Sequence, residues 1–278
     1  MVYSEKRACK FLLDFCWKNH QRFCPRCKCR EFYRLTDGRR RCKRCLYSFH
    51  DFSRRFLNRG AFSCQQWLWF LKFFALEIPL ASIATEMDIS YATVLKAADT
   101  VRRAILAQAL DAEKIYAAGI WPGPGNPLPD KKIFDVPVFG IIEVENMAIC
   151  DLMPNLQAEH LLHYKLNFYL KTASVGQIVY TAPYRHYQAL ISCGPGLWPM
   201  PHIQHKDRRL PIEGTAFWSV TKRRFQQLRG ISASHFALYL KEFELRYNAH
   251  GQDLFAILAQ AMCAFVPRLV LEKRSSVD

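Results

Sequence analysis

Two closely spaced cysteine couples near the N-terminus limit the folds open to this chain more than any other feature. Cys24 and Cys27 are separated by two residues, Cys42 and Cys45 are spaced in the same way, and fourteen residues lie between the couples. Each couple can turn tightly enough for both sulfurs to face one ion, so two couples can form a tetrahedral zinc site. We therefore predict that these four cysteines bind a structural zinc ion, with a redox pair as the alternative.

The residues between the couples indicate a small β-hairpin. Residues 32–39 are typical of a strand, a tight turn at Asp37-Gly38 and a returning strand. Together with the cysteines, this pattern predicts an N-terminal helix and a basic zinc ribbon over residues 1–60. Cys29 could replace Cys27 as a ligand, but the spacing of the couples favours Cys27.

Positive charge is concentrated in the same region. Residues 1–60 contain 17 Lys and Arg against 5 Asp and Glu, a charge of +12 out of the total of +15, whereas residues 61–115 carry −1 and residues 116–278 carry +4. A basic block beside a nearly neutral body indicates a ribbon that lies on nucleic-acid phosphates, with a solvated basic face as the alternative. The candidate contacts are Arg34, Arg39, Arg40, Arg41, Lys43, Arg44, Arg54 and Arg55.

The remaining cysteines do not suggest a disulfide framework. The chain has 11 cysteines, an odd number, and its first residues lack the apolar region of a secretory signal. We expect most of the isolated cysteines to be small buried residues; they are Cys9, Cys16, Cys64, Cys150, Cys193 and Cys263. Lys72, Pro267 and Arg268 interrupt the longest apolar runs, so we expect neither a membrane span nor secretion.

The next region has the pattern of a helix-turn-helix. A helix over residues 62–78, which Ser63 could cap, is followed by a short helix from residue 80, a turn at residues 87–89 and a longer helix capped by Ser90. Ile83, Ile89 and Val94 are expected inside. The predicted DNA contacts near the start of the second helix are Ser90, Tyr91, Thr93 and Lys96. A plain helical hairpin is the alternative for this region of residues 61–115.

A Gly- and Pro-rich loop at residues 119–130 marks the start of a third region, residues 116–278. Its patterns predict strands at residues 136–144, 147–151 and 177–181. They predict helices at residues 158–170, 184–191, 216–229 and 235–248, and from about residue 252. We expect a multidomain α+β protein in which this region is an α/β core with C-terminal helices.

Several motifs in this order resemble the DDE transposases of the Merlin group and their bacterial insertion-sequence relatives of the ISXO type. The motifs follow the ribbon and the helix-turn-helix and consist of residues 136–140 (VPVFG), 179–181 (VYT), 217–224 (FWSVTKRR) and 239–248 (YLKEFELRYN). The resemblance covers nearly the whole chain. It implies an RNase H-like core behind a DNA-binding N-terminus, and three acidic residues that hold two divalent metal ions.

The acidic positions implied by the resemblance carry no acid here. Ala182 stands where the second Asp would follow the Tyr-Thr pair, Thr215 stands two residues before Phe217, and the first Asp would fall near Ala117. The resemblance therefore implies a degenerate core that has lost its catalytic Mg²⁺ site. Glu213 is close enough to reach the site only if its segment is extended.

We accordingly expect a catalytically inactive, transposase-derived protein that binds specific DNA sequences, as a domesticated regulator or as the DNA-targeting subunit of a nucleoprotein complex. One alternative is an active cut-and-paste transposase with displaced acids such as Glu113, Asp151 and Glu213. Another is a scaffold that binds protein or RNA through the inactive core. DNA is the expected partner, a homodimer or a protein partner is left open, and we expect a nucleoid-associated location in a bacterial cytoplasm or a nuclear location in a eukaryote.

Overall fold

The structure is a computed structural model, and it describes residues 4–17, 19, 21–60, 62–117, 137–144, 147–157, 189–193, 199–204, 216–228 and 235–267. The chain divides into two compact units. Met1–Gln108 and Gly251–Asp278 form the first, here called the ribbon–helix unit, and Ala109–His250 form the second, the sheet unit. This division differs from the predicted boundaries at residues 60 and 115, because a helix near the C-terminus packs with the N-terminal helices.

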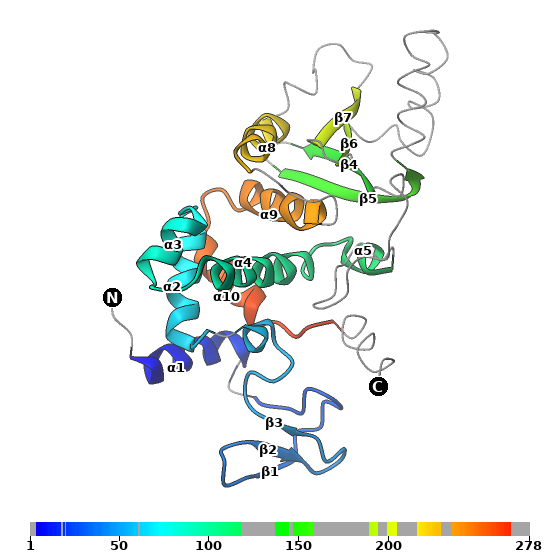
Figure 1. Ribbon diagram of the computed structural model, residues 1–278. Helices are drawn as coiled ribbons and strands as arrows, with labels where there is room; N and C mark the ends of the chain where they lie inside the picture. The colour runs from blue at the N-terminus through cyan, green and yellow to red at the C-terminus, as the bar shows by residue number, and fades with distance from the viewer. Residues whose placement is uncertain are drawn as a thin grey trace. The chain divides into compact units, whose positions relative to one another are not determined.

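The ribbon–helix unit contains a small sheet and a group of packed helices (Figure 1). The sheet has the order β1-β2-β3. In chain order the elements are α1 (Glu5–Cys16), β1 (Phe32–Arg34), β2 (Arg40–Cys42), β3 (Ser48–Phe49), η2 (Phe56–Arg59), α2 (Cys64–Ala75), α3 (Leu80–Glu86), α4 (Tyr91–Leu106) and α10 (Leu254–Cys263).

Helix α2 forms the centre of this helical group because its apolar residues recur at helical spacing. Trp67, Phe70, Leu71 and Phe74 are all buried on one side of the helix. Ser63 begins the helix with a capping box: its side chain accepts a hydrogen bond from the Gln66 backbone, and the Gln66 side chain accepts one from Ser63. The predicted cap at Ser63 is therefore confirmed.

Helix α10 returns to the N-terminal helices at the far end of the sequence. It packs against α1, α2 and α4, and Leu258, Ala259 and Met262 are buried. A β-bridge between Arg55 and Phe265 and a stacked pair of rings from Phe11 and Phe255 join the same segments. The ribbon–helix unit is therefore built from both ends of the chain, with the sheet unit inserted between them.

The sheet unit has four antiparallel strands in the order β5-β4-β6-β7. Helix α9 packs on β5, and the Phe139 ring of β4 meets the Phe236 ring of α9. The elements are α5 (Ala112–Ala117), β4 (Pro137–Val144), β5 (Met147–Gln157), β6 (Ala189–Cys193), β7 (Pro199–Gln204), α8 (Ala216–Gln227) and α9 (Phe236–Asn248).

Most predicted elements of this unit that fall on described residues are found, with one correction. The expected helix at residues 184–191 is wrong for residues 189–191, which lie in β6 and pair with β4. Phe139, Gly140 and Ile141 of β4 pair with Ile191, Leu190 and Ala189, and this ladder satisfies backbone N–H and C=O groups of a buried strand. The helix expected at residues 158–170 and the strand expected at 177–181 lie outside the described residues.

Two short motifs near the end of α9 fasten it to the sheet. Asn248 exchanges two hydrogen bonds of 2.7 Å with the backbone of Ala148 in β5, one donated from each residue. The Tyr247 hydroxyl donates a 2.7 Å bond to Glu143 in β4, and the same Glu143 oxygen accepts from the backbone N–H of Phe217 at the start of α8. The Tyr-Asn pair therefore joins β4, β5, α8 and α9. None of the described helices has the length and apolar character needed to span a membrane.

Candidate metal centre and nucleic-acid interface

The four predicted metal ligands meet at one point of the ribbon. The Sγ atoms of Cys24 and Cys45 are 3.6 Å apart, those of Cys27 and Cys42 are 3.5 Å apart, and all four lie within 4.8 Å of one another. A zinc ion with Zn–S bonds of about 2.3 Å requires sulfurs roughly 3.8 Å apart at the corners of a tetrahedron. The arrangement therefore fits a structural zinc ion that uses all four thiolates.

Both couples use the same backbone turn. The N–H of Cys24 donates to the carbonyl of Cys29, and the N–H of Cys42 donates to the carbonyl of Tyr47, five residues later in each case. The fourth residue after the first cysteine, Lys28 or Leu46, has a positive φ of 62° or 57°. Cys29 thus occupies the place that Tyr47 occupies in the second turn, and its sulfur contacts the Glu31 carbonyl. The structure selects Cys27 as the ligand.

The thiols are already electrostatically unequal. Desolvation raises the pKa of Cys24 to about 12 and outweighs the backbone N–H groups of Cys27 and Arg26. Desolvation also acts on Cys42, but the backbone N–H groups of Cys45 and Arg44 and the thiols of Cys27 and Cys45 lower its pKa to about 6. A zinc ion would replace the protons of all four thiols, so its affinity would rise with pH.

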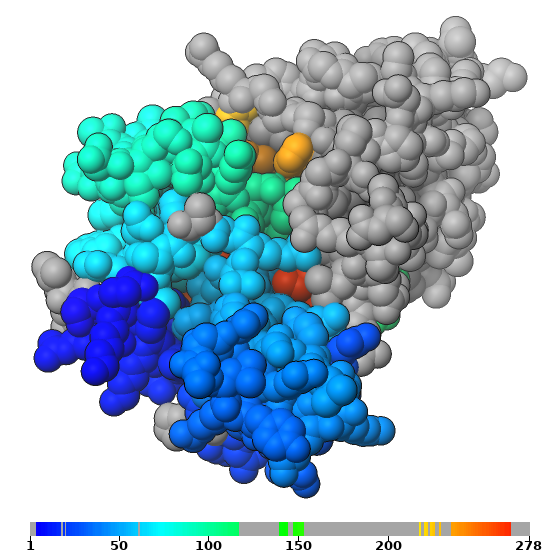
Figure 2. Space-filling model, turned by 60° about the horizontal axis from the view of Figure 1, so that its bottom comes forward, coloured from blue at the N-terminus to red at the C-terminus, as the bar shows by residue number. Residues whose placement is uncertain are grey.

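Strand alternation separates the metal side of the ribbon from an outer face. Phe32, Cys42 and Phe49 turn inward to pack around the cysteines. Tyr33 and Arg41, which pair across β1 and β2, turn outward, and Tyr33 is 56% exposed. Lys43 places its ammonium 5.5 Å from the Tyr33 ring. We call Tyr33, Arg39, Arg41 and Lys43 the outer ribbon face; Figure 2 brings the ribbon (blue) to the front.

Most of the predicted phosphate contacts on the ribbon are accessible. Arg34, Arg39, Arg41, Lys43 and Arg44 are exposed. Among the described residues, no carboxylate forms a salt bridge with Arg34, Arg41 or Arg44, whereas Arg39 pairs with Asp37 and Lys43 with Glu31 at the surface. Five of the eight predicted side chains are therefore available to an external anion.

The other three predicted contacts, Arg40, Arg54 and Arg55, interact with other groups of the protein. For Arg55 the predicted phosphate contact is wrong. Arg55 is only 3% exposed, and its guanidinium donates to the backbone carbonyls of Cys16, at 2.6 Å, and Cys263. It also lies 4.4 Å from the ring of Trp17 and 4.1 Å from the ring of Phe265. Arg55 thus joins α1 to the end of α10 and is not available to DNA.

Arg40 and Arg54 are intermediate in exposure between the exposed ribbon cations and the buried Arg55. Arg40 donates a 2.7 Å charged hydrogen bond to Asp51, which also accepts from Arg22 at 2.8 Å, and the Arg40 side chain is 15% exposed. Arg54 is half-buried with its guanidinium over the Tyr47 ring, and its carbonyl accepts from the Val266 N–H at 2.8 Å. These internal uses cannot be read from the basic composition of the segment.

Helices α3 and α4 form the predicted two-helix motif. The Ser90 hydroxyl caps α4 by accepting from the Thr93 N–H, and the two hydroxyls are 2.8 Å apart. Ile83 and Val94 are buried, and Ile89 is half-buried. Tyr91 and Lys96 are exposed on α4 as predicted. Leu95, which is 41% exposed beside them, was missed because an apolar residue at this spacing is usually placed in a core.

Several acids of the sheet unit, among the residues that the structure describes, pair with cations of the same unit. Lys241 is 3% exposed and lies 2.7 Å from Asp111 and 2.8 Å from Glu244, and its ammonium also donates to the carbonyl of Cys150. Asp111 accepts a second bond from the Leu152 N–H. Burial would lower the pKa of Lys241, but Glu244 and Asp111 outweigh it and raise that pKa. We call Lys241, Asp111 and Glu244 the buried lysine cluster.

Comparisons with known proteins match two segments of the chain to transposase domains. Residues 3–48 match a transposase zinc-ribbon domain, and residues 131–248 match an ISXO2-like transposase domain. An uncharacterized transposase-like protein of Haemophilus influenzae is 33% identical over 99 residues, which cover 35% of this chain and 77% of that protein. The chain belongs to the ISXO2-like transposase family. No solved structure matches it.

The ISXO2-like domain match contains two of the three positions expected to have lost an acid. Ala182 and Thr215 lie outside the described residues, and Ala117 is the last residue of α5. Among the described residues, the groups that could hold a metal ion are the four ribbon cysteines and Glu5 with Cys9 and Cys64. In the described part of the chain, the carboxylates of the sheet unit form no further candidate metal site. Asp151, one of the acids considered as a displaced ligand, pairs with Lys114 at 3.1 Å.

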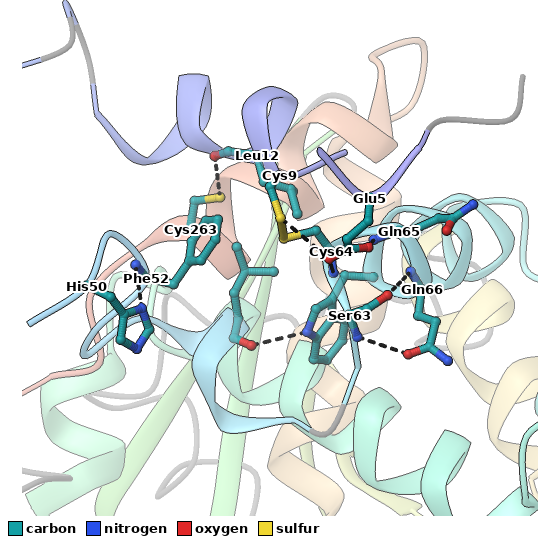
Figure 3. The surroundings of a disulfide bond; sticks show 12 residues. Glu5, Cys9, Leu12, His50, Phe52, Ser63, Cys64, Gln65, Gln66 and Cys263 are labelled. Carbon is teal, nitrogen blue, oxygen red and sulfur yellow. Dashed lines mark hydrogen bonds between the residues drawn. A yellow bond between two sulfur atoms is a disulfide. The ribbon is translucent and has the colours of Figure 1, made fainter. Parts of the chain in front are cut away.

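The structure also corrects the expectation for two isolated cysteines. Cys9 of α1 and Cys64, the first residue of α2, form a disulfide across 55 residues of sequence (Figure 3). Glu5, one turn before Cys9, accepts from the backbone N–H groups of Cys64 at 2.8 Å and Gln65 at 2.9 Å. Local spacing in the sequence cannot predict a disulfide between cysteines that are 55 residues apart. Cys16, Cys150 and Cys263 are buried free thiols, as predicted.

Proposed function

We propose that this ISXO2-like family member is a sequence-specific DNA-binding protein that lacks metal-dependent strand transfer. The outer ribbon face is the observation that carries the proposal. Its exposed Tyr33 ring lies across the hairpin from Arg41, which forms no salt bridge within the described residues, and 5.5 Å from the Lys43 ammonium. The ribbon would hold phosphates, and the start of α4 would read base edges in the major groove.

The acids of the sheet unit support the second half of the proposal. Two-metal catalysis needs carboxylates that converge on ions about 3.5–4 Å apart. Here Asp111 and Glu244 share Lys241, Asp151 pairs with Lys114, and Glu143 accepts from Tyr247. These carboxylates are held by the chain itself. We further propose that the sheet unit descends from an RNase H-like core related to the Merlin group and now serves as a scaffold or dimerisation surface.

Binding can be tested by selecting preferred sites from a random duplex pool with the full, zinc-loaded chain. Fluorescence anisotropy then compares the selected site with its scrambled sequence. Lys96→Ala is expected to reduce the preference for the selected site by about tenfold, in the range that one good base contact provides. Lys10→Ala, which removes an exposed lysine from α1, is the matched control and should leave the preference unchanged. Equal affinity of the unmodified protein for both duplexes would refute sequence-specific reading.

Loss of catalysis needs its own assay. The selected duplex is incubated with the protein and Mg²⁺ or Mn²⁺, and strand breaks are followed on a denaturing gel. We expect no protein-dependent nicking or joining. Metal-dependent cleavage that disappears on addition of EDTA would show that displaced acids still form an active site.

A further inference from the structure

We infer that the outer ribbon face binds DNA at an unstacked base, and that the Tyr33 ring stacks on that base. The inference rests on the proposed DNA-binding function and adds to it the kind of DNA that the ribbon prefers: duplex with an extrahelical base, or a strand end that has opened. Tyr33 was not among the predicted contacts.

The packing of the ribbon gives Tyr33 no structural task. Its neighbour Phe32 points inward and meets the Phe49 ring edge-on at 5.9 Å. The other ribbon tyrosine, Tyr47, stacks on Phe49 with an interplanar angle of 6°. Tyr33 instead stands outward from the middle position of β1 with 56% of its surface exposed. An apolar ring in that position on such a small sheet costs solubility and leaves a flat surface free for a ligand.

The cations around the ring select the ligand. Arg41 lies directly across the hairpin, and Lys43 places its ammonium 5.5 Å from the ring centre. Arg39 is exposed just before β2, with its guanidinium on Asp37 at the surface. A nucleic-acid strand laid across this hairpin would therefore meet the charges of Arg41 and Lys43 while its base faces the Tyr33 ring.

An unstacked base fits this surface better than an intact duplex does. In a duplex both faces of each base are covered by neighbouring bases, so an aromatic ring can touch only edges or sugars. An extrahelical base exposes its whole face, and stacking of a base on an aromatic side chain beside a positively charged groove is the general mode of single-strand recognition. The ribbon hairpin has both features, an exposed aromatic ring and cations beside it.

The experiment uses the full, zinc-loaded chain and three labelled probes at one salt concentration: a short DNA duplex, the same duplex with one extrahelical thymine, and the matching RNA duplex with an extrahelical uridine. The unmodified protein is expected to bind the bulged DNA more tightly than the plain duplex. Tyr33→Ala should weaken binding to the bulged DNA by about tenfold, with no change for the plain duplex. Tyr33→Phe should retain the preference because it keeps the ring.

A spectroscopic readout separates stacking from a general loss of binding. With 2-aminopurine as the extrahelical base, the unmodified protein and Tyr33→Phe should quench its fluorescence, and Tyr33→Ala should not. Arg41→Ala should weaken both DNA probes alike. Zinc content of one ion per chain shows that each variant retains its ribbon.

Three results would overturn the inference. If Tyr33→Ala keeps the preference for the bulged DNA, the stacking role is refuted. If the protein also binds the plain duplex in that case, the proposed DNA-binding function is unaffected. Tighter binding of the bulged RNA than of the bulged DNA would assign the surface to RNA. No binding of any probe would refute both the inference and the proposed function.

Discussion

On the ribbon, arginines and lysines stand on the outside of three short strands, and several have no acidic neighbour among the described residues. In the sheet unit, Lys241 is buried and its charge is shared by Asp111 and Glu244. The first arrangement keeps charge free for a ligand, and the second consumes charge in holding strands and helices together. The comparison shows that an exposed cation without an acidic partner can bind another molecule, whereas a buried and paired cation cannot.

The same contrast exists within the ribbon–helix unit. Arg41 is exposed, whereas Arg55, fourteen positions later, is buried between Trp17 and Phe265 and donates to two carbonyls. Both residues belong to the basic block that indicated a nucleic-acid partner. A charged residue in the sequence therefore indicates ligand binding only if its side chain is exposed in the fold. Substitutions of Arg41 and Arg55 can separate ligand binding from structural contact.

The largest expected effect comes from removing the metal. Cys42→Ser removes one of four thiolates, and because structural zinc contributes on the order of 10 kcal/mol to the folding of small domains, the ribbon should unfold. We expect zinc content and DNA affinity to fall to background while the sheet unit retains its cooperative unfolding transition. Cys29→Ser is the control and should keep both zinc and affinity. Undiminished DNA binding by a zinc-free Cys42→Ser protein would separate the ribbon from recognition.

A large effect confined to the sheet unit is expected for Lys241→Met. The substitution leaves Asp111 and Glu244 buried without their shared cation, which typically costs about 3–5 kcal/mol in the free energy of unfolding. Urea unfolding should show this loss, while zinc content and DNA affinity stay unchanged. Lys114→Met, which breaks the exposed pair with Asp151, should cost less than about 1 kcal/mol. Equal losses for the two variants would mean that the buried lysine cluster carries no special weight.

The smallest effects distinguish the two arginines. Arg55→Met leaves the carbonyls of Cys16 and Cys263 without their donor, so the ribbon–helix unit should lose about 2–3 kcal/mol of stability. DNA affinity of the folded protein should not change. Arg41→Ala should do the reverse: stability stays within about 0.5 kcal/mol, and the salt dependence of DNA binding falls by about one unit of slope. Loss of DNA affinity in a folded Arg55→Met protein would contradict the structural role assigned here.

Local signals in the sequence predict much of the fold and of the metal site. The cysteine couples, the caps at Ser63 and Ser90 and the hairpin around Asp37-Gly38 each act over a few residues, so their geometry follows from short stretches of chain. The four ligands were predicted from spacing alone, and the structure brings them together.

Contacts between distant segments could not be predicted in the same way. The Cys9–Cys64 disulfide spans 55 residues, and the two carbonyls that accept from Arg55 lie 39 and 208 positions away from it. The return of α10 likewise depends on contacts between segments far apart in the sequence. Strand β7 was missed because Pro199 and Pro201 argue against a strand. Its position at the edge of the sheet explains how the prolines are tolerated, since an edge strand needs fewer backbone donors.

The return of α10 has a consequence for the order of events during synthesis. A ribosome releases the ribbon and α1 to α4 first, then the whole sheet unit, and only afterwards residues 254–263, which fill the space against α1, α2 and α4. A nascent chain therefore emerges with its helical core open and with Arg55 lacking its acceptor on Cys263. The helices that would read DNA therefore reach their final packing only after the inserted unit has been made.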